Sequence, residues 1–150
     1  MPRNKPWDSY RKVATQTATP GHLVLMLYDG AISFLDRSLT GFDYTDPLLF
    51  NQTISNNVRR AQAIISELNA TLNMELGGEV AENFRRLYNY FDRRLQHANI
   101  KKQRAPIEEI IARLRVFRDA WAEMLRQGRD GYRGPALEPP PGRTLTSEAA

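Results

Sequence analysis

The segment FNQTISNNVRRAQAIISELNATL, residues 50–72, is the strongest indicator of the fold of this chain. Its apolar residues recur every three or four positions, so at about 100° per residue they fall on one arc of an α-helix. The members of this stripe are Phe50, Ile54, Val58, Ala61, Ile65, Leu68 and Leu72. Most of the other positions of the segment are polar. We therefore expect a helix over residues 47–74 that buries a single stripe against other helices.

Three more segments have the same periodicity, over residues 20–41, 79–102 and 106–127. The stripe of the segment at 79–102 is Val80, Phe84, Leu87, Tyr88, Phe91, Leu95 and Ala98. That of the segment at 106–127 is Ile107, Ile110, Ile111, Leu114, Phe117, Trp121 and Leu125. Amphipathic helices of this kind share a core, and short connections make consecutive helices antiparallel. The sequence therefore predicts an all-α fold, an antiparallel up-and-down four-helix bundle.

Proline and glycine mark the predicted helix ends. Proline occupies a first helical position at Thr19-Pro20, Asp46-Pro47 and Ala105-Pro106, and Thr19 and Asp46 are capping side chains. Gly77-Gly78 separates the second segment from the third. The expected organisation is an N-terminal arm (1–18), a bundle domain (19–128) and a disordered tail rich in proline and glycine (129–150).

Composition excludes several classes of function. The chain has 150 residues and no cysteine, which rules out disulfides, thiolate zinc sites and cysteine nucleophiles and fits a reducing cytosol. No apolar run is long enough to cross a bilayer, and the start does not read as a secretory signal. His22 and His97 follow Thr19 and Arg94 at a spacing of three, so neither belongs to a Glu-x-x-His metal pair. We expect a cytosolic protein that is not an enzyme and has no metal or cofactor.

The segment TATPGHLVLMLYDGAI, residues 17–32, carries more apolar surface than one core stripe requires. Around the predicted helix at 20–41 the apolar side chains span an arc of about 200°. Leu25, Ile32 and Leu39, with Tyr28 at the edge, form the part beyond a normal stripe, which we call the surplus face. Either this is the most buried helix of the bundle, or the surplus face lines a groove for an apolar helix of another protein.

A net charge of +4 and a pI near 9.6 raise nucleic-acid binding as an alternative. The segment from Glu79 to Arg104 holds seven basic and three acidic residues and thus the whole excess. Its arginines occur as adjacent pairs and splay around the helix, which favours a solvated face with intrahelical ion pairs. The alternative function would use Arg85, Arg86, Arg93, Arg94 and Lys101.

Four stretches resemble the FliS family of flagellin export chaperones: SYRKVATQTATPGHLVLMLYDGAI (9–32), RAQAIISEL (60–68), GGEVAENFRRLYNYFDRRLQHAN (77–99) and LRVFRDAW (114–121). The resemblance implies a non-catalytic four-helix bundle that binds the C-terminal segment of flagellin in the cytosol. It would prevent premature filament polymerisation and assist flagellar type III secretion, with export-gate components as further partners. On this resemblance the flagellin groove would consist of the surplus face with Tyr28, joined by Tyr10 from the arm.

Overall fold

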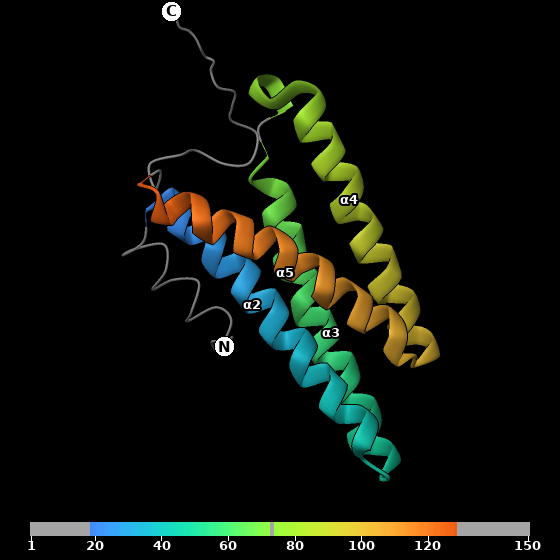
Figure 1. Cartoon of the computed structure of the whole chain (residues 1–150). Coiled ribbons are helices and arrows are strands. Elements are labelled where there is room, and N and C mark those ends of the chain that lie inside the picture. The colour runs from blue at the N-terminus through green and yellow to red at the C-terminus, as the bar shows by residue number, and fades with distance from the viewer. Residues whose placement is uncertain (1–18, 73, 129–150) are drawn as a thin grey trace, which may run out of the picture.

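The computed structural model describes residues 19–72 and 74–128, and within these residues the chain is helical without any strand (Figure 1). The elements are α2 (Pro20–Thr40), the short 3-10 helix η1 (Gly41–Asp43), α3 (Pro47–Ala70), α4 (Met74–Lys101) and α5 (Arg104–Arg126). The arm predicted at 1–18 and the tail predicted at 129–150 lie outside the described residues.

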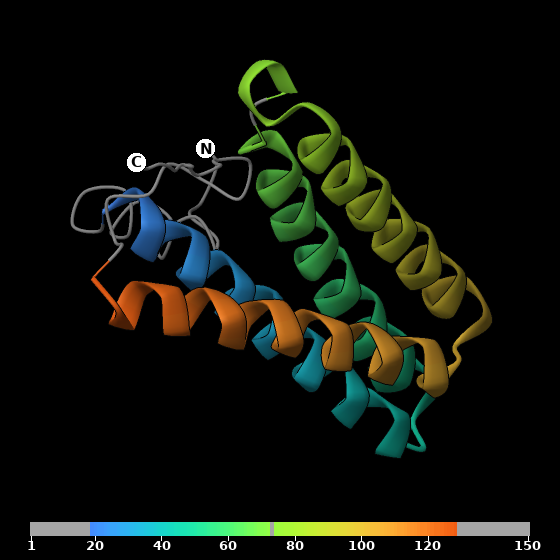
Figure 2. The same cartoon turned by 45° about the horizontal axis from the view of Figure 1, so that its top comes forward.

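Consecutive helices run in opposite directions, and each packs against two others (Figures 1 and 2). Helix α2 lies between α3 and α5, and α4 contacts the same two helices from the other side. The prediction of an all-α, antiparallel four-helix bundle is confirmed. Figure 2 shows that the pair α2 and α5 diverges from the pair α3 and α4 at one end of the bundle.

The helix starts agree with the predicted ones at Pro20 and Pro47 and differ in detail elsewhere. The Thr19 hydroxyl accepts a hydrogen bond from the backbone N–H of His22, 3.2 Å away, as a capping residue does. Asp46 occupies the equivalent position before α3, but its side chain makes no capping hydrogen bond, so that prediction is wrong. Helix α5 begins two residues before Pro106, which fits because the first N–H groups of a helix have no intrahelical acceptor.

Two glycines serve distinct geometric purposes. Gly78 has φ 52° and ψ −126° and interrupts α4, so the predicted break lies inside a helix that begins at Met74. A Cβ atom on Gly41 would lie 2.8 Å from Cγ1 of Ile54, so the missing side chain allows η1 to approach α3 closely. Asp29-Gly30 continues α2 without a turn.

One apolar core joins all four helices, and the three predicted stripes supply most of it. One assignment needs correction. Val80 is 50% exposed, in the first turn after the Gly78 break. Four further members of the stripes are partly buried and pack against the core: Phe50, Phe84, Leu87 and Phe117.

Candidate protein-binding surface

Helix α5 covers the side of α2 that carries the surplus face. Leu25, Asp29, Ile32, Asp36 and Leu39 follow one another at steps of four and three, so they line one side of α2. Both acids of this line are bound by α5. Arg118 Nε lies 2.7 Å from Asp29 Oδ1, and Arg115 Nη2 lies 3.1 Å from Asp36 Oδ2. The surplus face therefore turns toward α5.

The predicted groove required an exposed surplus face, and two of its residues are buried instead. Ile32 and Tyr28 are 8% and 2% exposed and belong to the core, so they do not form an open surface. Leu25 and Leu39 are partly buried and pack against the core from its edge. Helix α2 packs its wide apolar arc against two neighbours, α3 and α5. Tyr10 lies outside the described residues.

A hydrogen bond between two tyrosines crosses the core from α2 to α4. The hydroxyl oxygens of Tyr28 and Tyr88 are 2.6 Å apart and buried. Burial raises the pKa of Tyr28 to about 12 and also raises the pKa of Tyr88, so both hydroxyls are neutral at physiological pH. Periodicity placed both rings on apolar faces of their helices. It did not indicate that the two hydroxyls form a hydrogen bond, because the residues are 60 positions apart in sequence.

Replacing Tyr88 by phenylalanine is expected to lower the free energy of unfolding by about 1–3 kcal/mol, because the buried Tyr28 hydroxyl loses its partner. The double variant Tyr28→Phe/Tyr88→Phe should be closer to the wild type than either single variant, since it leaves no unsatisfied hydroxyl. Urea denaturation of the four proteins measures the coupling. Strictly additive losses would show that the two hydroxyls do not depend on each other.

Large apolar side chains remain exposed at the turn between α2 and α3. Tyr44, Leu48 and Leu49 are 44%, 60% and 43% exposed. Beside them the rings of Phe42 and Phe50 meet edge to face, with centroids 5.7 Å apart. The adjacent pair Leu48-Leu49 did not identify this patch from the sequence, because pairs of the same kind, Ile64-Ile65 and Ile110-Ile111, are buried.

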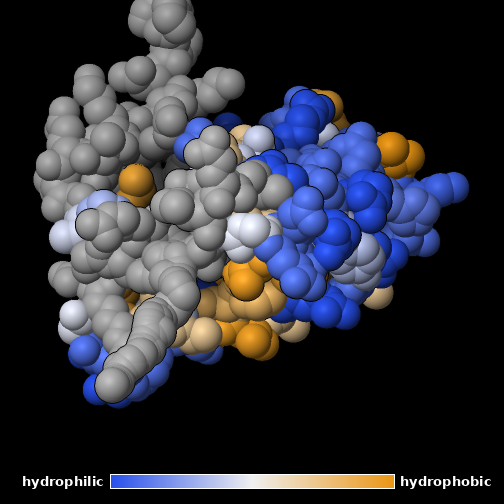
Figure 3. Space-filling view, turned by 90° about the horizontal axis from the view of Figure 1, so that it is seen from above, coloured by the Kyte–Doolittle hydropathy of each residue, from blue (hydrophilic) through white to orange (hydrophobic). Residues whose placement is uncertain are grey.

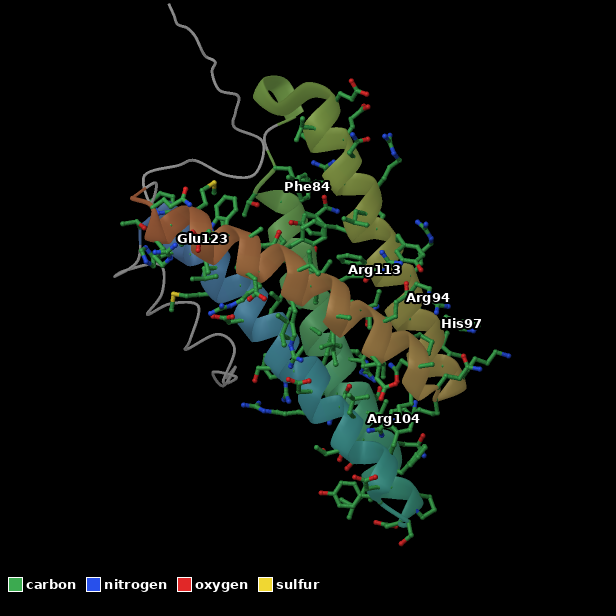
Figure 4. All side chains as sticks on the ribbon, in the orientation of Figure 1. Phe84, Arg94, His97, Arg104, Arg113 and Glu123 are labelled. Carbon is green, nitrogen blue, oxygen red and sulfur yellow. The ribbon has the colours of Figure 1, made fainter. Side chains whose placement is uncertain are left out.

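The basic surface of α4 is partly neutralised by α5. Arg94 donates to Glu109 Oε1 at 2.8 Å, Arg113 donates to Oε2 at 3.0 Å, and the Tyr90 hydroxyl donates to Oε2 at 2.6 Å. Figure 4 shows Arg94 and Arg113 at neighbouring levels of the two helices. The hydrogen bond from Tyr90 and those from the two arginines lower the pKa of the Glu109 carboxyl. Seen from above, hydrophilic side chains cover the side of α4, and a hydrophobic patch lies beside them (Figure 3).

We expect Glu109 to make folding sensitive to acid. Its pKa is lower in the folded protein than the ordinary value of about 4.3, so the unfolded chain binds the proton more readily. The stabilisation is complete above that ordinary value and is lost as the pH falls through the lowered folded-state pKa. Urea midpoints measured from neutral pH down to about pH 3 should therefore fall less steeply for Glu109→Gln than for the wild type. Parallel acid profiles would contradict this expectation.

Residues 19–72 and 74–128 contain no group of histidine, aspartate and glutamate side chains arranged to hold a metal ion. Across the same residues, every helix falls short of the length and apolar character that a bilayer crossing needs. His22 contacts Thr19 at the start of α2, with its Nδ1 3.0 Å from the hydroxyl oxygen, and His97 is exposed on α4 (Figure 4).

Comparisons with known proteins agree with this geometry. The family model described as flagellar protein FliS matches residues 3–128. The flagellar secretion chaperone FliS of Bacillus subtilis (strain 168) is 34% identical over 134 residues, which cover 89% of this chain and 96% of that protein. FliS of Salmonella typhimurium is 34% identical over 74% of this chain and 80% of its own length. FliSB of Pseudomonas aeruginosa is 36% identical over 78% of this chain and 93% of its own length.

The family match and the named relatives assign this helical bundle to a family of flagellar secretion chaperones, which is not a family of enzymes. The chain belongs to the FliS family. The resemblance identified from the four sequence stretches is thereby confirmed.

Proposed function

We propose that this chain is a cytosolic chaperone of flagellar secretion that binds the C-terminal segment of flagellin, prevents its premature polymerisation and presents it to the export gate. The observation that carries this proposal is the match to the FliS family over residues 3–128, together with relatives named flagellar secretion chaperones. The function is one of binding, without catalysis and without a cofactor.

We assign two roles to the predicted site residues according to their burial. Leu25 and Leu39 lie at the edge of the core and are the proposed contacts to an apolar helix of flagellin. Ile32 and Tyr28 lie beneath them and hold α2 in place, so they support the site from the core. Tyr10 is the proposed contribution of the arm.

Calorimetric titration with the C-terminal segment of flagellin from the same organism tests the proposal. We expect binding at micromolar concentration or below with a negative heat-capacity change, as apolar burial produces. Leu25→Asp should weaken binding at least about tenfold, because the carboxylate would have to be buried against an apolar ligand. Leu48→Asp is the matched control, since it places the same charge at a leucine that is 60% exposed on another part of the surface.

Helical circular dichroism of both variants shows whether the bundle remains folded. Absence of binding by the wild type at high micromolar concentration would reject the proposal, and equal losses in the two variants would reject Leu25 as a contact. Nucleic-acid binding through α4 is the alternative, and its affinity would fall steeply with salt. It has less support because Glu109 already binds Arg94.

A further inference from the structure

Two arginines from different helices approach one aromatic ring. The guanidinium carbon of Arg37, on α2, lies 5.2 Å from the centroid of the Phe34 ring, and that of Arg60, on α3, lies 5.8 Å from the same centroid. Phe34 itself is only 7% exposed, so its ring is fixed in the core. Figures 1 and 2 show α2 and α3 side by side near the turn that joins them, and the two guanidinium groups approach the Phe34 ring from these two helices. We call this group the arginine pair.

The arginine pair has no carboxylate to neutralise it among the described residues. The positions three and four residues away from Arg37 and Arg60 hold no acid, so neither has an intrahelical ion pair. No ion pair reaches either of them from another helix within residues 19–72 and 74–128. The arginines of α5 differ, since Arg115 and Arg118 are both bound to acids of α2. The bundle thus leaves two neighbouring positive charges uncompensated at one place.

Stacking on a fixed ring prepares these side chains to bind an anion. An aromatic face attracts a guanidinium group and restricts its orientation, which reduces the conformational entropy lost on binding. The planar group still has N–H donors in its plane, and their spacing matches the two oxygens of a carboxylate. Two such groups beside one ring therefore form a recognition site for an acidic side chain.

We propose that the arginine pair binds an acidic residue of the flagellin segment, fixing the position of a ligand that is otherwise held by apolar contacts. This inference rests on the proposed function. It favours a protein carboxylate over the phosphates of a nucleic acid, because nucleic-acid affinity comes from many cations along a backbone and this site supplies two at one point beside a buried ring. The result is directional binding, since an apolar groove alone does not set the register of a helix within it.

Nuclear magnetic resonance of the isotope-labelled full chain tests the site without flagellin. The probe is a capped peptide of alternating glutamate and glycine, and the Nε–Hε signals of Arg37 and Arg60 are assigned with the variants R37Q and R60Q. Both signals should shift saturably with the probe. The Nε–Hε signal of Arg59 is the internal control, because this neighbour on α3 donates to Ser55 and has no aromatic ring contact in the described structure. A peptide with glutamine in place of glutamate should leave all three signals unchanged.

Calorimetry with the flagellin segment then tests the role in binding. R37Q and R60Q should each weaken binding about tenfold, and R37K should also weaken it because lysine retains the charge but not the planar pair of donors. R59Q, which removes the same charge one residue away, should change the affinity less than about twofold. Thermal melts of all variants should stay near that of the wild type, since no ion pair is broken.

The outcomes separate the two proposals. If the wild type does not bind the flagellin segment, the proposed function fails, and the peptide titration still decides whether the arginine pair takes a carboxylate. If the segment binds but R37Q and R60Q behave like R59Q, the inference is overturned while the proposed function stands. Larger shifts of the two arginine signals with a single-stranded oligonucleotide than with the acidic peptide would overturn it in favour of a phosphate ligand.

Discussion

Replacing Phe91 by alanine is expected to lower the free energy of unfolding by about 3–5 kcal/mol. The side chain is fully buried, and its ring lies 6.2 Å from those of Tyr88 and Tyr90 and 6.5 Å from that of Phe117, measured between centroids. Removing it leaves a cavity where α4 meets α5, and the surrounding rings are too rigid to fill it. Urea or thermal denaturation followed by circular dichroism measures the loss, which approaches the whole stability of a small domain.

Phe84→Ala is the matched control, because it also removes a phenylalanine ring from α4, about two helical turns before Phe91. Phe84 is only partly buried, with its ring 5.7 Å from that of Phe117, so solvent can occupy part of the vacated space. Its loss should be clearly smaller, about 1–2 kcal/mol. An equal or greater effect of Phe84→Ala would mean that the core is centred nearer to the start of α4 than the structure places it.

Ile32→Asp is expected to unfold the bundle or to destabilise it by several kcal/mol. Ile32 is 8% exposed, so the new carboxylate would be buried without a partner. Asp29 and Asp36 are its neighbours along the same side of α2, and the α5 arginines that bind them are already engaged, so the added negative charge meets repulsion. Loss of helical circular dichroism, or a large fall of the urea midpoint, is the expected result.

The control for this variant is Ile32→Val, which removes one methylene group and should cost about 0.5–1.5 kcal/mol. The comparison decides between the two interpretations of the surplus face. If Ile32→Asp keeps the wild-type melting temperature and only loses flagellin binding, position 32 faces an open groove and the packing of α5 over it is wrong.

Periodicity alone was sufficient to predict the helices and most of the core. The stripe from Ile54 to Leu68 is buried as expected, because the geometry of an α-helix places every third or fourth residue on the same side whatever surrounds it. The clear error lies at a helix end. Val80 continues its stripe in sequence, yet it is 50% exposed in the first turn after the Gly78 break.

The candidate site depends on contacts between helices that are far apart in sequence, and periodicity within one helix does not predict such contacts. The sequence predicted the wide apolar arc of α2 but not which part of it is buried. The packing of α5 decides this, and Arg118 of α5 binds Asp29 of α2 although 89 residues separate them in sequence. The same holds for the hydroxyl pair of Tyr28 and Tyr88. A helical pattern determines which side of a helix is apolar because that property is local. How many neighbours cover that side, and which charges meet across them, is decided by the packing of helices far apart in sequence.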